Sequence, residues 1–352
     1  MANNRHFIPH LHAFRGFAII NIVGAHAWSF MIFWTGDLSS IGLKWLFALT
    51  ETVFHGSTLY FAIISGLLFS KILSVKGWSR FYTSKVTNVL LPYTLVTFLL
   101  TALYWQYALQ DPLINNTAID YLKVASLNLI TGKGSIHFWY IPVLVVMFLA
   151  TPFLSWLKGK SHIATCLLML MPLIISRSPF PDFLKPQSFA FFIGAYALGM
   201  VIGEHYDRLI QLTDKYLKPL ITLVIISTLS IFLLYLNDYK PDGFYSLRQT
   251  LIYLQKVSIC LLVLHWFYHK ESALPQWLST LGSYAFAIFF LHVIFIDLVI
   301  SSVRTIAVTY RTAEAIALLG SLNLIVAVIG SVLLASIIKK CFGRHSRKII
   351  GV

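Results

Sequence analysis

Charged residues are scarce in this sequence. Only 11% of its 352 residues are Asp, Glu, Lys or Arg, whereas 58% are hydrophobic and the mean hydropathy is +0.77. Soluble domains carry about a quarter of their residues as charged side chains. The composition therefore excludes soluble, disordered and collagen-like proteins, and it predicts an integral membrane protein.

Acidic residues and cysteines are both few. The sequence has 13 acidic against 27 basic residues, a net charge of +14, but in membrane proteins such an excess usually lies in cytoplasmic loops. We therefore expect no nucleic-acid partner. The three cysteines, Cys166, Cys260 and Cys341, are too few and too dispersed for a disulfide framework or a thiolate metal site.

Several catalytic motifs are also missing. The sequence has no G-x-S-x-G elbow, no H-E-x-x-H, no Walker-type glycine-rich loop and no Cys/His zinc spacing, so serine-hydrolase, zincin and ATPase functions have no motif support. His10 and His12 form an H-x-H pair, but two ligands do not make a metal site. We expect no metal.

Long apolar runs fill most of the chain. A bilayer core needs about 20 apolar residues per helix, and only helices satisfy their own backbone groups in lipid without closing a barrel. We predict an all-α polytopic bundle of about ten transmembrane helices, with residues 1–352 as one transmembrane domain and cytoplasmic tails at 1–12 and 339–352. The predicted spans lie near 13–33, 53–72, 89–109, 138–157, 162–176, 187–204, 218–236, 249–268, 280–302 and 316–338.

The distribution of lysine and arginine indicates the orientation. With the N-terminus in the cytoplasm, most of the basic residues outside the spans fall on the cytoplasmic side, which is the usual arrangement. Both termini are therefore predicted to be cytoplasmic. The first span is too long for a cleavable signal peptide, and no small-residue cleavage site follows it before Trp34.

Two ionisable residues in the first span are the strongest functional candidates, because charged side chains are costly in a bilayer. Arg15 precedes His26 by eleven residues, which places them roughly 16 Å apart along one stripe of a helix. Alone, Arg15 is compatible with an interfacial anchor, and His26 with a buried packing histidine. Their shared stripe favours a functional cavity.

Other polar groups allow two interpretations each. Glu51 and His55 lie four residues apart on one helical face, either as a functional pair or as an exposed interfacial one. The basic loop that contains Lys71, Arg80 and Lys85 either binds phosphate or only signals topology.

Further ionisable residues fall at or within later spans. An aromatic belt at the outer interface explains Trp139 and Tyr140 but leaves His137 unexplained. Lys256, His265, His292 and Asp297 lie inside spans, where a large bundle often buries a few polar groups against partners.

Five motifs in order resemble the acyltransferase-3 family of membrane-bound O-acyltransferases. They are Arg15 with His26, the F-x-I-S-G type segment 61–66, the basic segment 85–93 that ends in Pro-Tyr, His137 to Tyr140, and the segment 283–292 that ends in His292. The sequence departs from the family pattern at His12, where an acidic residue is common, and at Val89, where a second arginine is common.

The resemblance implies transfer of an acyl group, usually acetyl, from cytoplasmic acyl-CoA to a hydroxyl of an envelope glycan or lipid-linked sugar, in the bacterial inner membrane. An imidazole suits proton abstraction, and a guanidinium suits a phosphate or pantetheine oxygen. His26 would be the general base or a transient acyl acceptor, and Arg15 would orient the donor. The remaining implied roles are CoA phosphate binding by Lys71, Arg80 and Lys85, and acceptor binding by Glu51, His55, His137, Trp139, Tyr140 and His292.

Alternatives from other classes remain. Intramembrane Arg, His, Lys and Asp also build the pathways of secondary transporters and flippases, although the sequence shows no matched pair of broken helices. An inert membrane scaffold would tolerate replacement of Arg15 and His26. The expected partners are acyl-CoA, a glycan or lipid-linked sugar acceptor and the bilayer, and a homo-oligomer is compatible with the sequence.

Overall fold

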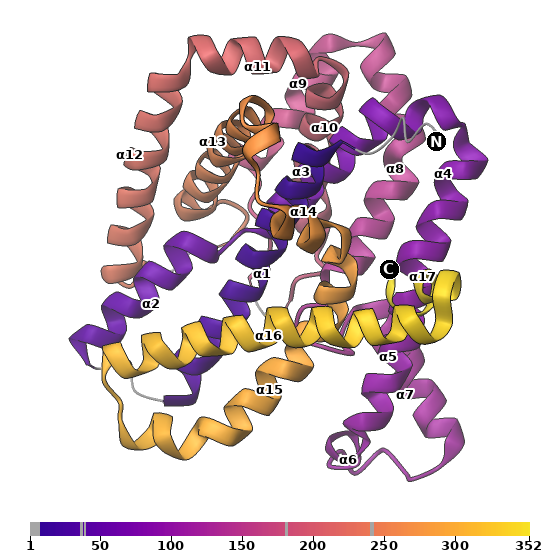
Figure 1. The fold of residues 1–352 in the computed structure, drawn as a ribbon, viewed down its shortest axis with the longest axis vertical. Coiled ribbons are helices and arrows are strands. Elements are labelled where there is room, and N and C mark those ends of the chain that lie inside the picture. The colour runs from indigo at the N-terminus through magenta and orange to yellow at the C-terminus, as the bar shows by residue number, and fades with distance from the viewer. Residues whose placement is uncertain (1–7, 36–37, 39, 180–181, 240–242) are drawn as a thin grey trace.

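A computed structural model describes residues 8–352 except 36–37, 39, 180–181 and 240–242. The described residues form helices and turns, with no strand among them (Figure 1). Two π turns, Phe69–Leu73 and Val86–Leu90, bracket α4. The α-helices are α1 (Pro9–Thr35), α2 (Ile41–Phe54), α3 (Thr58–Leu68), α4 (Trp78–Lys85), α5 (Leu91–Leu103), α6 (Trp105–Ala108), α7 (Ala118–Thr131), α8 (Tyr140–Lys160), α9 (His162–Leu170), α10 (Pro186–Glu204), α11 (Tyr206–Lys215), α12 (Leu217–Leu236), α13 (Leu247–His269), α14 (Gln276–Ser283), α15 (Ala285–Thr309), α16 (Ala313–Phe342) and α17 (Ser346–Ile350).

Helices long and apolar enough to cross a membrane account for most of the described chain, as predicted. There are nine of them in that part, and a tenth predicted span, 162–176, corresponds to the shorter apolar helix His162–Leu173. The fold is an all-α polytopic membrane bundle. The nine candidate spans are Pro9–Trp34, Ile41–Lys76, Trp78–Leu103, Tyr140–Lys160, Pro186–Glu204, Leu217–Leu236, Leu247–His269, Ala285–Thr309 and Ala313–Ile350.

Helix α1 lies in the middle of the bundle. It contacts α2, α13, α14, α15 and α16, and residues on several of its faces, among them Ala13, Phe14, Ile19 and Val23, are fully buried. A helix that is apolar on all sides is a core helix. The stripe with Arg15 and His26 therefore faces protein and cavities rather than lipid.

Small residues allow α3 and α10 to pack closely. A Cβ atom on Gly199 of α10 would lie 2.0 Å from the carbonyl oxygen of Ile63 on α3, and one on Gly66 would lie 2.2 Å from that of Tyr196. Glycine at such contacts lets backbones approach, which is how many membrane helices associate. This contact holds α3 against α10, and α3 also contacts α1.

The predicted second span, 53–72, lies within the candidate span Ile41–Lys76, but a break interrupts its helix. The chain breaks between α2 and α3, where Gly56 has a φ of +77°. A Cβ atom at Gly56 would lie only 2.5 Å from Cγ2 of Ile252 on α13, so the close approach of α13 also requires glycine. The break places Glu51 and His55 at the end of α2 rather than near the start of a longer span.

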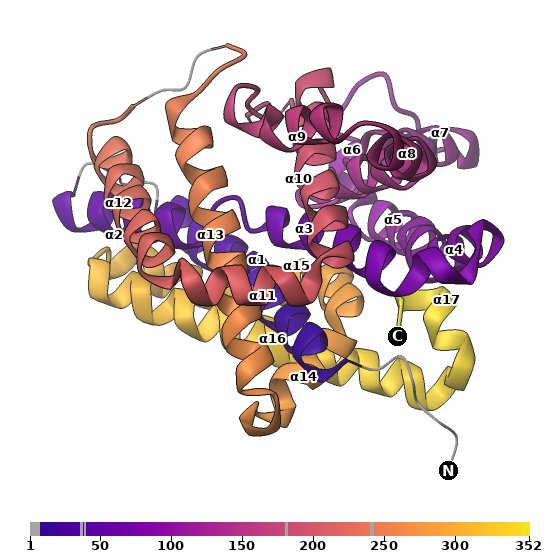
Figure 2. The ribbon, with the colours of Figure 1, turned by 90° about the horizontal axis from the view of Figure 1, so that it is seen from above.

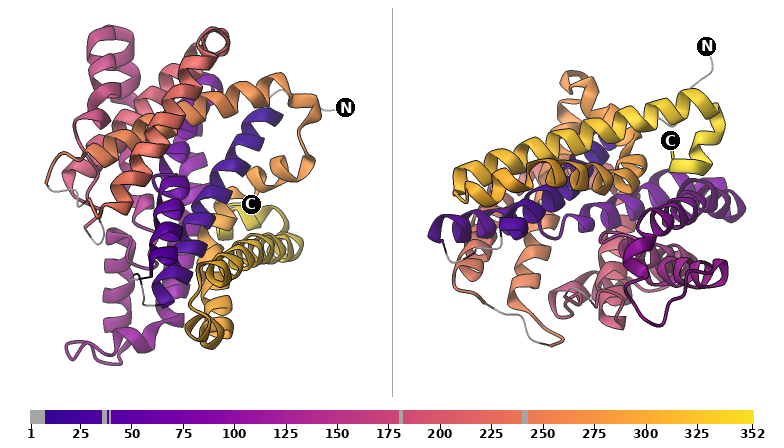
Figure 3. Two further views of the ribbon diagram at one scale, coloured as in Figure 1. Left: turned by 90° about the vertical axis from the view of Figure 1, so that its left-hand side faces the viewer. Right: turned by 90° about the horizontal axis from the view of Figure 1, so that it is seen from below.

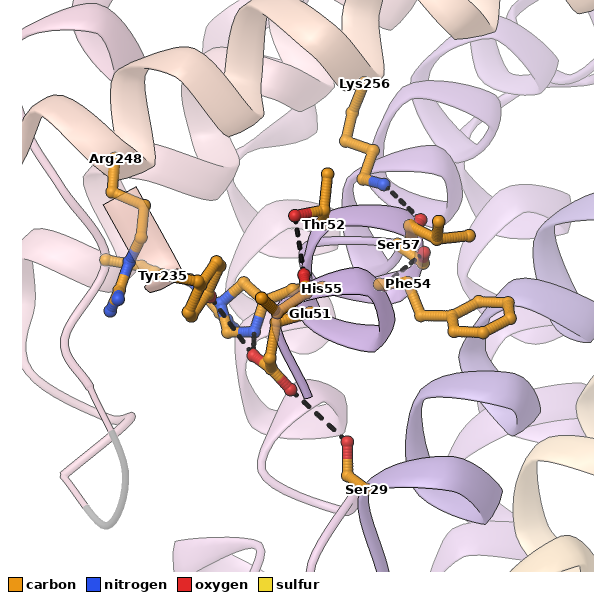
Figure 4. A network of polar contacts seen from close by, with 12 residues as sticks. Ser29, Glu51, Thr52, Phe54, His55, Ser57, Tyr235, Arg248 and Lys256 are labelled. Atoms are coloured by element: carbon orange, nitrogen blue, oxygen red, sulfur yellow. Dashed lines mark hydrogen bonds and ion pairs between the residues drawn. The ribbon is translucent and has the colours of Figure 1, made fainter. Parts of the chain in front are cut away.

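Side chains of α13 bind the carbonyl groups that the break frees. The buried Lys256 ammonium donates to the Val53 carbonyl at 2.6 Å (Figure 4). The Gln255 amide donates to the Thr52 carbonyl at 3.3 Å. Freed backbone groups inside a membrane need such partners. This contact gives the intramembrane Lys256 a structural role.

Two further helices frame the bundle. Helix α16 runs obliquely across it and contacts α1 and α15 (Figures 1 and 3). The short polar helix α11 lies across one end, between α10 and α12, as Figure 2 shows from above, and it contacts α13. After α16, the short α17 turns back to contact α5.

Candidate active site

Three histidines from distant parts of the chain meet beside α1. Nδ1 of His26 on α1 lies 3.0 Å from Nε2 of His292 on α15. The ring of His137, which precedes α8, lies 4.5 Å from the His292 ring and 5.8 Å from the His26 ring, centroid to centroid. His137 and His292 are both buried. The structure thus brings together three residues that the sequence indicated separately.

The hydrogen bonds of His292 fix the protonation of His26. Nδ1 of His292 lies 2.9 Å from the Ile288 carbonyl and 3.0 Å from the Phe289 carbonyl, which are acceptors only, so Nδ1 carries the hydrogen. Nε2 of neutral His292 is then an acceptor, and the His26 Nδ1–H donates to it. Nε2 of His26 is left with a free lone pair and with no hydrogen-bond partner among the described residues.

His137 has one occupied and one unoccupied nitrogen. Its Nδ1 lies 3.1 Å from the Ser135 hydroxyl, while Nε2 is buried without a hydrogen-bond partner in the described part of the chain. Burial, and secondarily the neighbouring His292 and His26, hold the pKa of His137 well below its usual value. His137 is therefore a neutral imidazole with a polar atom available to a ligand.

A cavity of about 550 Å³ adjoins the histidines. We call it the His26 cavity. Aromatic side chains form much of its wall, and several predicted acceptor residues lie on it together: Glu51, His55, His137 and Trp139. Of the other two, Tyr140 is buried against Trp139 and Phe192, and His292 contacts the cavity wall through His26 and His137.

A network of polar contacts centred on Glu51 and His55 adjoins the same cavity (Figure 4). The Arg177 guanidinium donates to Nε2 of His55, and Nδ1 of His55 donates to Oε2 of Glu51 at 2.7 Å. Tyr235 and Ser29 also donate to the Glu51 carboxylate, at 3.1 and 3.3 Å. Because Ser29 lies one turn beyond His26 on α1, the network is tied to the histidine site.

Sequence reasoning missed Arg177. It lies outside the spans, in the segment between α9 and α10, where a lone arginine is an ordinary loop residue. In the structure its guanidinium lies 5.7 Å from the Trp139 ring and 5.8 Å from the Phe183 ring, and burial lowers its pKa. Those two rings stack on each other at 4.4 Å.

A second cavity, of about 520 Å³, surrounds Arg15. We call it the basic cavity, because Arg15, Lys85, Lys339 and Arg347 line it and no acidic side chain does among the described residues. The Arg15 guanidinium lies 5.9 Å from the Phe286 ring. Lys339 and Arg347 were interpreted from the sequence only as tail charges. Lys339 reaches the cavity from the last turn of α16, and the return of α17 toward α5 brings Arg347 here.

Two of the predicted phosphate-binding residues lie elsewhere. The Lys71 ammonium lies 4.4 Å above the ring of Tyr206, and Arg80 is an exposed residue of α4. Neither lines the basic cavity. In contrast, His12 and Val89, the two positions that depart from the family pattern, both line it.

The two cavities lie along the same helix but share no lining residue. Arg15 lines the basic cavity and His26 lines the His26 cavity. The two residues are eleven positions apart on α1, or roughly 16 Å at 1.5 Å per residue. The arrangement suits an elongated molecule whose charged end binds at Arg15 and whose reactive end reaches His26.

Comparison with known proteins identifies the family. The sequence model of Acyl_transf_3, described as an acyltransferase domain, matches residues 8–340. Searches of curated proteins and of solved structures gave no significant match. Because the match covers nearly the whole chain, including His26, His137 and His292, this chain belongs to the acyltransferase-3 family and is a membrane O-acyltransferase.

Proposed function

We propose that the protein transfers an acyl group, in the simplest case acetyl, from acyl-CoA to a hydroxyl of an envelope glycan or lipid-linked sugar. The observation that carries the proposal is the hydrogen-bond chain from the Ile288 and Phe289 carbonyls through His292 to His26. It leaves a lone pair on Nε2 of His26, a residue of the cavity wall. A neutral imidazole oriented in this way is a general base.

The reaction balances with these groups alone. Nε2 of His26 takes the proton of the acceptor hydroxyl while the hydroxyl oxygen attacks the thioester carbonyl carbon. The carbon–sulfur bond then breaks, and the CoA thiolate takes the proton from His26 to leave as the thiol. Throughout, the His26 Nδ1–H stays bonded to His292, which stabilises the transient imidazolium.

The basic cavity is the proposed donor site. Arg15, Lys85, Lys339 and Arg347 would bind the phosphate groups of CoA, since guanidinium and ammonium groups pair well with phosphate. The pantetheine arm would then extend along α1 toward His26. Lys71 and Arg80 are not part of this proposal, because the structure places them outside the cavity.

The His26 cavity is the proposed acceptor site. Its aromatic wall, with Trp139 and Phe183, suits the apolar face of a sugar, and His137 and the Glu51 network offer hydrogen bonds to hydroxyl groups. With both termini in the cytoplasm, as the positive-inside rule favours, the basic cavity faces the cytoplasmic acyl-CoA. The acceptor would enter from the other side of a bacterial inner membrane.

Mass spectrometry of envelope glycans tests the proposal in four strains: gene intact, gene deleted, His26→Ala and His162→Ala. We expect one acetyl increment to disappear in the deletion and in His26→Ala, since loss of a general base costs roughly 10²- to 10⁴-fold in rate. His162 is an exposed histidine on α9 and is the matched control.

Two results would contradict the proposal. Full acetylation in His26→Ala membranes would show that another group is the base. An unchanged glycan profile in the deletion strain, together with ion-gradient-dependent uptake in vesicles, would favour the transporter alternative.

A further inference from the structure

Two histidines and an aspartate meet far from the proposed acyl-transfer site. Asp214 lies near the end of α11, and His265 and His269 lie on the last turns of α13. Nε2 of His265 is 2.6 Å from Oδ1 of Asp214, and Nε2 of His269 is 3.5 Å from Oδ2. None of the three residues lines the His26 cavity or the basic cavity.

The three side chains converge on one point. The two histidines are four residues apart, so their rings lie on the same helical face, with centroids 4.6 Å apart. One ligand atom from each of the three residues lies within 4.8 Å of the others, the one such group of three or more among the described residues. Two imidazoles and a carboxylate are the ligand types of zinc and related ions.

The spacing is close to that of a coordinated ion. Metal–ligand distances of about 2.0–2.1 Å place tetrahedral ligands about 3.3 Å apart. The His269 to Asp214 distance of 3.5 Å already fits. The His265 to Asp214 distance must open from its hydrogen-bonded 2.6 Å, and the half-exposed Asp214 side chain, 51% accessible, is free to make that shift.

The open side of the cluster faces solvent. The His269 side chain is 46% accessible, so a hydrated ion reaches the site and retains water as a further ligand. The nearest acidic residue along the chain, Glu271, contacts His10 instead. The site therefore offers three protein ligands and at least one coordination position open to water.

An ion here would add a cross-link between α11 and α13, which already pack together through Tyr206 and Tyr268. Only Tyr206, Ile210 and Thr213 of α11 are buried, and α11 lies on the surface across the end of the bundle (Figure 2). We propose that Asp214, His265 and His269 form a binding site for a divalent transition-metal ion such as Zn²⁺ or Co²⁺, which cross-links α11 to α13. The site is independent of acyl transfer.

Metal titration of the purified protein tests this proposal. The full chain, purified in detergent with a tag that contains no histidine and then stripped with a chelator, is titrated with Zn²⁺ by calorimetry. The variants are Asp214→Asn, His265→Ala and His269→Ala, with His162→Ala as the matched control. We expect one ion per chain in the wild type and in His162→Ala, and affinity lowered by more than about tenfold in each cluster variant.

A second measurement needs no variant. Zinc or cobalt X-ray absorption of the loaded wild type should show two imidazole ligands and otherwise oxygen ligands. Size exclusion of the metal-free variants shows that each retains the fold. Absence of binding to the wild type, binding that all three cluster variants retain, or a ligand set without two imidazoles would each overturn the proposal. None of these results depends on the acyl-transfer assay.

Discussion

Replacing His292 by phenylalanine removes the acceptor of the His26 Nδ1–H and nothing that touches the substrate directly. When His26 takes a proton it becomes an imidazolium, and its bond to His292, 3.0 Å long in the resting state, becomes charge-assisted. A hydrogen bond to a charged group contributes about 1.5–3 kcal/mol. Since about 1.4 kcal/mol is a factor of ten in rate, we expect acyl transfer to fall about 10- to 150-fold.

Incorporation of labelled acetyl from acetyl-CoA into the glycan fraction of membranes measures this change. His292→Phe is compared with His292→Gln, whose amide oxygen offers an acceptor near the position of the imidazole Nε2. The glutamine variant should recover part of the lost rate. His292 is fully buried, so size exclusion and thermal unfolding of each variant separate a folding defect from a catalytic one.

The double variant gives the sharper test. If His292 acts only through His26, then His292→Phe should cause no further loss in a His26→Ala background, because the group that it positions is absent. Equal losses in both backgrounds would refute the proposed chain from His292 to His26. So would wild-type activity in a correctly folded His292→Phe.

Two further predictions concern the helix break and the basic cavity. Gly56→Ala should lower the free energy of unfolding by about 1–3 kcal/mol, since its φ of +77° strains an alanine and the new Cβ would lie 2.5 Å from Cγ2 of Ile252. Unchanged thermal unfolding would contradict this. The double variant Lys339→Ala/Arg347→Ala should raise the KM for acyl-CoA and leave kcat nearly unchanged in steady-state kinetics. Lys340 lies outside the cavity, so the control variant Lys340→Ala should change neither constant.

The spans were predictable because a bilayer imposes a length on every helix that crosses it. The break in the second span was not, because one glycine hardly changes the hydropathy of a 20-residue window. What requires the break is tertiary: α13 brings Ile252 against Gly56, and Lys256 with Gln255 binds the freed carbonyls. The sequence contains Gly56 and an intramembrane Lys256, but nothing in it indicates that α13 packs Lys256 against the break at Gly56.

The residues of the candidate site also differ in how far the sequence could relate them to one another. Arg15 and His26 could be related from sequence because both lie on one helix, where 100° per residue fixes their relative direction. His137 and His292 were candidates only one by one, since nothing local indicates that their segments meet His26. Lys339 and Arg347 were interpreted as topology signals, because the approach of Lys339 to Arg15 depends on how α16 crosses the bundle and that of Arg347 on how the chain returns after α16.

The structure also separates structural from chemical roles among the ionisable residues of the spans. The Lys256 ammonium is fully buried and donates a hydrogen bond to a backbone carbonyl that the helix break frees. This hydrogen bond offsets the free-energy cost of burying the ammonium and also satisfies the carbonyl. His26 lines a cavity, with one nitrogen bound to His292 and the other without a hydrogen-bond partner in the described chain. A polar atom left unpaired inside a bilayer is costly unless a ligand or water uses it. In the proposed mechanism this unpaired Nε2, rather than a charge, is the atom that takes the proton of the acceptor hydroxyl.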